Sequence, residues 1–66
     1  MDGLDELWAD LLSAEAARIR RAWNGLSAEE RLAVLDHLVR MRDEDGWHPA
    51  QRASAAAAIQ VIHDPA

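Results

Sequence analysis

The 66-residue chain contains no cysteine, no lysine, no tyrosine and no phenylalanine. Without cysteine it can form neither disulfide bonds nor thiolate metal sites. No stretch approaches the ~20 apolar residues of a membrane-spanning helix, and the acidic N-terminal region lacks the apolar segment of a secretory signal. We therefore expect a cytoplasmic protein that contacts no membrane.

The charge and the apolar content limit the partners and the core. The net charge is −5 at pH 7, and all seven basic residues are arginine. A negative charge makes nucleic acid and anionic membranes unlikely partners. Half of the residues are hydrophobic, but 14 of these are alanine, so few large apolar side chains remain for a core. Chains this small often gain stability from self-association.

Residues 27–43 are predicted to form an amphipathic helix. Ser27 followed by Glu30 has the spacing of a capping box, in which each residue bonds the backbone amide of the other. Helical spacing sorts the apolar residues into two neighbouring stripes. The first stripe comprises Ala28, Leu32, Leu35 and Val39, and the second comprises Val34, Leu38 and Met41. Together they are wider than a helix on a surface needs, so we expect neighbours on two sides.

The region before Asn24-Gly25 predicts one continuous helix over residues 3–23. Asn24 and Gly25 both tolerate the left-handed conformation that ends many helices. The short connection to the next helix predicts that the two helices pack as antiparallel neighbours. Glu15 projects near the middle of the broad apolar face of this helix.

Residues 49–63 predict a third helix, with Pro49 at its first position, His48 as a poor cap, and Asp64-Pro65 after its end. Its small apolar face would let another helix approach closely. Nothing in the chain alternates with the period of a strand. The fold class is therefore all-α. We expect a single domain over residues 1–66, a small three-helix bundle or helical array that self-associates.

The sequence offers little for catalysis or cofactor binding. His37, His48 and His63 do not have the i, i+4 spacing that places two ligands on one helix face. No glycine-rich phosphate loop is present. A bundle of this size also leaves little room for a pocket of ~300–1,000 Å³. We expect no enzyme activity, no metal and no cofactor.

The leading functional hypothesis is a non-enzymatic protein–protein interaction module that self-associates or docks an unknown partner through apolar helix faces. The candidate interaction residues are Val34, Leu38, Met41, Ala55, Ile59, Ile62 and Trp47. Trp47 could instead plug the end of the bundle. One alternative is a small DNA-binding regulator of helix-turn-helix type that reads DNA with its third helix. Another is an accessory subunit of an enzyme encoded elsewhere.

Glu15 is the candidate polar residue of the core. A buried carboxylate is costly unless it is paired. One possibility is therefore a buried ion pair with Arg52, His37 or His63. The other is that the long side chain bends to the edge of the helix and keeps its tip in water.

Overall fold

The computed structural model describes residues 3–64, and this part of the chain consists of four α-helices and their connections. The helices are α1 (Gly3–Leu11), α2 (Ala16–Asn24), α3 (Ala28–Asp43) and α4 (Pro49–His63). No strand occurs among the described residues, so the prediction of an all-α fold is confirmed for them. No helix within this range is both long enough and apolar enough to cross a membrane.

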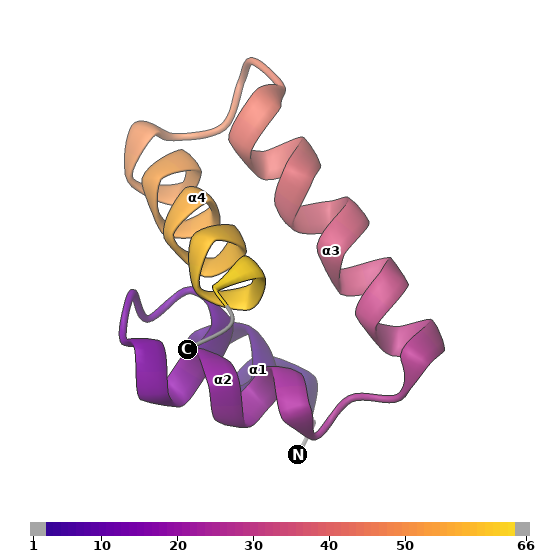
Figure 1. The fold of residues 1–66 in the computed structure, drawn as a ribbon. Helices are drawn as coiled ribbons and strands as arrows, with labels where there is room; N and C mark the ends of the chain where they lie inside the picture. The colour runs from indigo at the N-terminus through magenta and orange to yellow at the C-terminus, as the bar shows by residue number, and fades with distance from the viewer. Residues whose placement is uncertain (1–2, 65–66) are drawn as a thin grey trace.

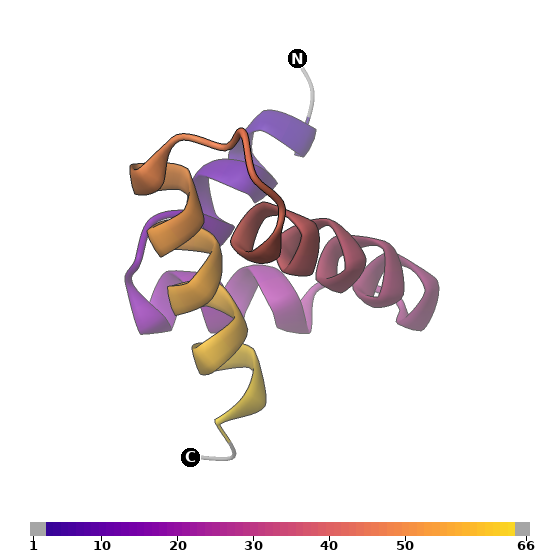
Figure 2. The same ribbon diagram turned by 90° about the horizontal axis from the view of Figure 1, so that it is seen from above.

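The helices are arranged around α4. The most extensive contact is between α3 and α4, and α2 packs against both α1 and α4. In Figure 1, α1 and α2 lie together on one side of α4, while the N-terminal half of α3 extends away from α4. Figure 2, turned by 90°, shows the same divergence. The N-terminal half of α3 is therefore not covered by α4.

All four helices contribute side chains to one core. The buried residues are Leu11, Ile19, Val34, Leu38, Met41, Ala55, Ala58 and Ile59. Ala55 and Ala58 are fully buried on α4. Because the distance between packed helices depends on the side chains at the contact, these small residues let α4 lie close to its neighbours.

The prediction of one helix over residues 3–23 is wrong. α1 ends at Leu11 and α2 begins at Ala16, so the fold has four helices rather than three. Between them Ala14 has a φ of 63°. A left-handed conformation costs a non-glycine residue ~1–2 kcal/mol, so other contacts must hold this corner.

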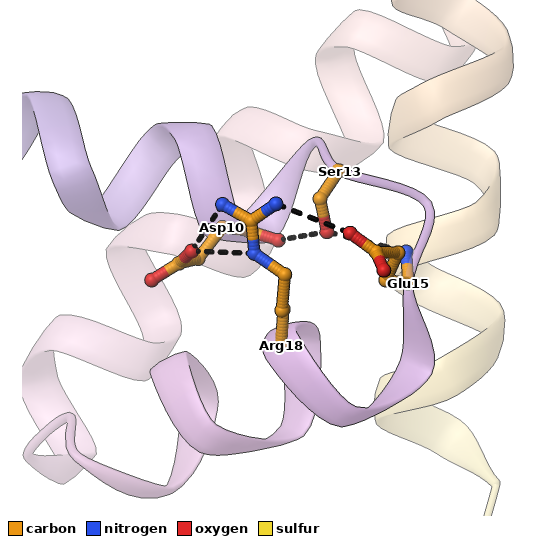
Figure 3. Close-up of polar contacts among 4 residues, drawn as sticks. All are labelled: Asp10, Ser13, Glu15 and Arg18. Atoms are coloured by element: carbon orange, nitrogen blue, oxygen red, sulfur yellow. Dashed lines mark hydrogen bonds and ion pairs between the residues drawn. The ribbon is translucent and has the colours of Figure 1, made fainter.

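Four residues hold the corner between α1 and α2 (Figure 3). The Ser13 hydroxyl donates to the carbonyl oxygen of Asp10 at 2.7 Å and accepts from the backbone N–H of Glu15 at 3.2 Å. The Arg18 guanidinium donates to Asp10 Oδ1 at 2.9 and 2.8 Å and to Glu15 Oε2 at 3.1 Å. These hydrogen bonds raise the pKa of Arg18, and the bond to Asp10 has the larger effect. Arg18 thus ties the end of α1 to the start of α2.

The start of α3 is capped as predicted. The backbone N–H of Glu30 donates to Ser27 Oγ at 3.2 Å, and the N–H of Ser27 donates to Glu30 Oε1 at 2.7 Å. The hydrogen bond from the Ser27 amide to the carboxylate favours its ionised form and lowers the pKa of Glu30. A local four-residue pattern was sufficient to locate this helix start.

Two other helix ends differ from expectation. His48 is a good cap, because its Nδ1 accepts from the N–H of Ala50 at 3.3 Å while Gln51 accepts from the N–H of His48 at 3.3 Å. α2 stops next to Gly25 as predicted, but Gly25 has a φ of −81° and is not left-handed. Its N–H donates to the carbonyl oxygen of Arg21 at 3.3 Å instead.

Candidate functional site

An open groove of about 460 Å³ lies between α1 and the N-terminal half of α3. It is lined by Leu7, Trp8, Leu26, Glu30, Ala33, Val34 and His37. Its volume falls within the ~300–1,000 Å³ that ligand sites occupy. The expectation that so small a bundle leaves little room for a pocket is therefore wrong.

The walls of the groove follow from helical spacing and from the corner. Glu30, Ala33, Val34 and His37 have the i, i+3, i+4, i+7 spacing of one helix face, and they form the α3 wall. α1 supplies the opposite wall through Leu7 and Trp8, and Leu26 joins them from the connection between α2 and α3. α1 takes this place because the chain changes direction after Leu11.

Aromatic rings meet at His37. Its ring centroid lies 5.0 Å from that of Trp8, with an interplanar angle of 66°. On its other side the centroid of Trp47 lies 5.7 Å away, at 86°. Both pairs are edge-to-face, the arrangement that aromatic rings prefer. Trp47 is half-buried and packs against the core, so it closes the α3–α4 end of the molecule next to the groove.

The groove offers mainly apolar surface. Its titratable side chains are those of Glu30 and His37, and the Glu30 carboxylate already accepts from the Ser27 amide. Among the described residues no polar or charged side chain is buried. No group of three or more histidine, cysteine or acidic residues suited to a metal occurs in residues 3–64. The groove therefore suits apolar side chains better than a ligand that needs many polar contacts.

The predicted interaction residues lie mostly in the core of a single chain. Val34, Leu38, Met41, Ala55 and Ile59 are buried, and Ile62 and Trp47 are half-buried. α4 occupies the place where a partner was expected, so most of this set is not accessible to one in this fold. Val34 alone of the set also lines the groove.

The exposed side of α3 is the other apolar stripe. Leu32 is 71% exposed, and it is the large hydrophobic residue that stands out as exposed among those described. Leu35 and Val39 on the same stripe are half-buried. At about 100° per residue, Leu32 lies roughly 160° around the helix from Val34. The groove and this stripe are thus separate surfaces.

Glu15 is a surface residue. Its side chain is 64% exposed and pairs with Arg18 rather than with any of the three cations considered from the sequence. An uninterrupted helix would have turned Glu15 toward the core, but Glu15 precedes the first turn of α2, and its side chain makes no capping hydrogen bond there. Of the two possibilities for Glu15, the structure therefore has the exposed one, and Glu15 belongs to the corner between α1 and α2 and not to the core.

Two of the three arginines of α2 pair with carboxylates of the chain. Arg18 pairs with Asp10 and Glu15, and Arg20 Nη2 lies 3.7 Å from Asp64 Oδ2. This cluster is the basic patch that a DNA-binding function would have to use. Part of its charge is already balanced by neighbouring carboxylates.

Comparison of the chain with protein families, with curated proteins and with solved structures finds no match.

Proposed function

We propose that the protein is a small, non-enzymatic helical module that binds another protein through the groove between α1 and α3. The observation that carries this proposal is the open apolar groove of about 460 Å³ beside the uncovered half of α3. Apolar concavities on small proteins often mark interaction sites. A cytoplasmic location is part of the same proposal.

The shape and lining of the groove favour a protein segment over a small reactant. Small-molecule sites combine an apolar lining with several polar groups that converge on the ligand. Here Glu30 is engaged in the cap of α3, and His37 lies between two tryptophan rings. An amphipathic helix laid in a groove needs mainly apolar contacts along one face.

Self-association through a second surface is the other candidate. The exposed Leu32, with Leu35 and Val39 beside it, forms an apolar stripe on α3 that a second copy of the chain could cover. In that case sedimentation at micromolar concentration would give a dimer, and Leu32→Arg would return it to a monomer. A monomer with a concentration-independent melting temperature would rule out this surface.

The DNA-binding and accessory-subunit hypotheses require different surfaces. A helix-turn-helix regulator would need basic residues free to meet phosphate, whereas Arg18 and Arg20 pair with carboxylates of the chain. Salt-dependent binding to generic duplex DNA would favour that hypothesis. An accessory subunit would use the same groove, and its enzyme would then be the protein captured in the experiment below.

Two neighbouring substitutions test the groove. Ala33 lines the groove and Leu32 does not, although both are exposed on α3. Ala33→Arg therefore fills the groove, while Leu32→Arg makes the same charge change outside it. With the immobilised protein in a lysate of its native host, we expect a bound protein that Ala33→Arg loses and Leu32→Arg keeps. A protein retained equally by both variants would show that the groove is not the binding surface.

A further inference from the structure

The negative charge of the chain is concentrated on the two segments that form the groove. Residues 3–11 and 28–37 carry six carboxylates and one guanidinium, a net charge of −5. The whole chain also has a net charge of −5, so the remaining residues sum to zero. The charge asymmetry therefore lies on the elements that form the candidate site, and Glu30 is the carboxylate that lines the groove itself.

The single guanidinium of these segments is used elsewhere. Arg31 Nε donates to the carbonyl oxygen of Trp23 at 3.2 Å, and the guanidinium carbon lies 5.5 Å from the centroid of the Trp23 ring. This cation–π contact holds Arg31 against α2. Its charge is therefore held on the α2 side of α3.

Four of the six carboxylates have no ion pair with another described residue. Asp10 pairs with Arg18, and Asp36 pairs with Arg40 at 3.2 Å. The others are Asp5 and Glu6 on α1 and Glu29 and Glu30 on α3, all of them exposed. Glu30 lines the groove, and the other three lie on the two helices that form it. These helices thus carry negative charge that another molecule could balance.

A second copy of the chain is a poor occupant of the groove. The exposed large hydrophobic residue that a copy would offer, Leu32, belongs to the acidic segment 28–37. Its insertion would bring two acidic segments together, and like charges across an interface are unfavourable. An occupant of opposite charge is favoured.

We propose that the groove binds a cationic amphipathic helix of a partner protein. Apolar side chains of that helix, at i, i+3 or i+4, and i+7, enter between Trp8 and Ala33. Its lysines or arginines, on either side of the apolar face, meet the carboxylates of α1 and of the first turn of α3. This inference rests on the proposed function and adds the chemistry of the partner.

The side chains of the groove fit such an occupant. Ala33 is small and exposed at the groove, so the backbone of a helix can approach it closely. Trp8 is half-buried, with its ring against His37, and presents a large fixed aromatic surface. Partly buried tryptophans of this kind dominate many protein interfaces.

The charge of the occupant is tested with two synthetic peptides. One is a labelled peptide of about five helical turns, with leucines at helical spacing and lysines elsewhere. The other has glutamates in place of the lysines. By fluorescence anisotropy we expect the lysine peptide to bind at least ~10-fold more tightly, with an affinity that falls as salt is added. Equal affinities, or no binding of the lysine peptide, would overturn the proposal.

The site is tested with the two arginine variants. Ala33→Arg should weaken binding of the lysine peptide ~10-fold or more, and Leu32→Arg by no more than ~3-fold, because both add one charge but only the first fills the groove. Equal losses would mean that the peptide senses net charge alone, and would overturn docking in the groove. If Ala33→Arg lowers the urea midpoint, the uncharged Ala33→Gln replaces it and must still weaken binding several-fold.

The outcomes separate this inference from the proposed function. If capture of a lysate protein depends on Ala33 but the two peptides bind alike, the groove remains an interaction site and the cationic partner is wrong. If capture does not depend on Ala33 and neither peptide binds, both proposals fail.

Discussion

The two connections on either side of α2 are both short. Glycine is the residue that most readily adopts a left-handed backbone, yet here an alanine adopts it in one connection and a glycine does not in the other. In the α1–α2 corner an alanine, Ala14, has a φ of 63°. In the α2–α3 turn a glycine, Gly25, has a φ of −81°, which any residue adopts. At these two connections the side-chain hydrogen bonds, rather than the position of glycine, decide where the chain turns.

A serine makes hydrogen bonds in each connection, but the supporting contacts span different distances in the sequence. Ser27 and Glu30 cap α3 within a single helical turn. Ser13 is supported by a bridge from Arg18 back to Asp10, eight residues earlier. The corner also places Leu7 and Trp8 across from α3. One wall of the groove therefore depends on the connection whose contacts span the longer distance.

The largest predicted effect is that of Ser13→Ala. It removes two hydrogen bonds while Ala14 stays left-handed, so we expect a loss of ~1.5–2 kcal/mol in the free energy of unfolding measured in urea. Ser54→Ala within α4 is the control, and it should be neutral or slightly stabilising because alanine is the better helix former. An unchanged midpoint for Ser13→Ala would mean that the corner is held by other contacts.

Removal of the local cap should have a smaller effect. Ser27→Ala should lower the free energy of unfolding by ~1 kcal/mol, because the amide of Glu30 loses its acceptor. Ser27→Asp keeps an oxygen at the same position and should retain most of the stability. If Ser27→Ala were as damaging as Ser13→Ala or more so, the contrast between the two connections would be wrong.

Replacing Ala14 by glycine and replacing Gly25 by alanine should each stabilise the protein. Ala14→Gly should gain ~0.5–1 kcal/mol, since it relieves the left-handed alanine but adds freedom to the unfolded chain. Gly25→Ala should gain ~0.5 kcal/mol, because its Cβ would meet carbonyl oxygens of Ala22 and Arg21 at 3.7 Å, an ordinary contact. Gly46→Ala is the control and should destabilise the protein, because Gly46 has a φ of 100°, which an alanine rarely adopts.

Acid should weaken the Ser27 cap. The folded-state pKa of Glu30 is lowered, chiefly by its hydrogen bond from the Ser27 amide. Its stabilising contribution is therefore complete above the unfolded pKa and is lost as the pH falls through the folded pKa. Between about pH 7 and about pH 3, the urea midpoint should fall more for the native protein than for Glu30→Gln, which has no carboxylate to titrate. Asp43, whose pKa is lowered by its hydrogen bond from Arg42, loses the same stabilisation in acid in both proteins. Its contribution therefore cancels from the comparison.

The smallest predicted effect is that of Glu15→Gln. The Glu15 side chain is 64% exposed, and Arg18 keeps both of its hydrogen bonds to Asp10. We expect a change below ~0.5 kcal/mol in urea at about pH 7. A loss of ~3 kcal/mol would instead indicate a buried pair, as the sequence allowed.

The candidate site could be predicted only in part. The spacing of Ala33, Val34 and His37 on one helix face is visible in the sequence, as is the cluster of acidic residues. That Trp8 would lie opposite this face was not visible, because it depends on the corner. The apolar stripe of Val34, Leu38 and Met41 was predicted to meet a partner but is buried within the chain. Helical periodicity identifies an apolar face without identifying what covers it.

The sequence by itself determined the all-helical fold, the bounds of the helices near 28–43 and 49–63, and the net charge. These features depend on composition and on interactions within about one helical turn. Only the tertiary structure decided the break at residues 12–15, the exposure of Glu15, and the groove between α1 and α3. The break and the exposure of Glu15 depend on side-chain contacts between α1 and α2 that span up to eight residues, more than one helical turn. The groove depends on how helices further apart in the sequence pack, because α4 covers one part of α3 and leaves the rest open.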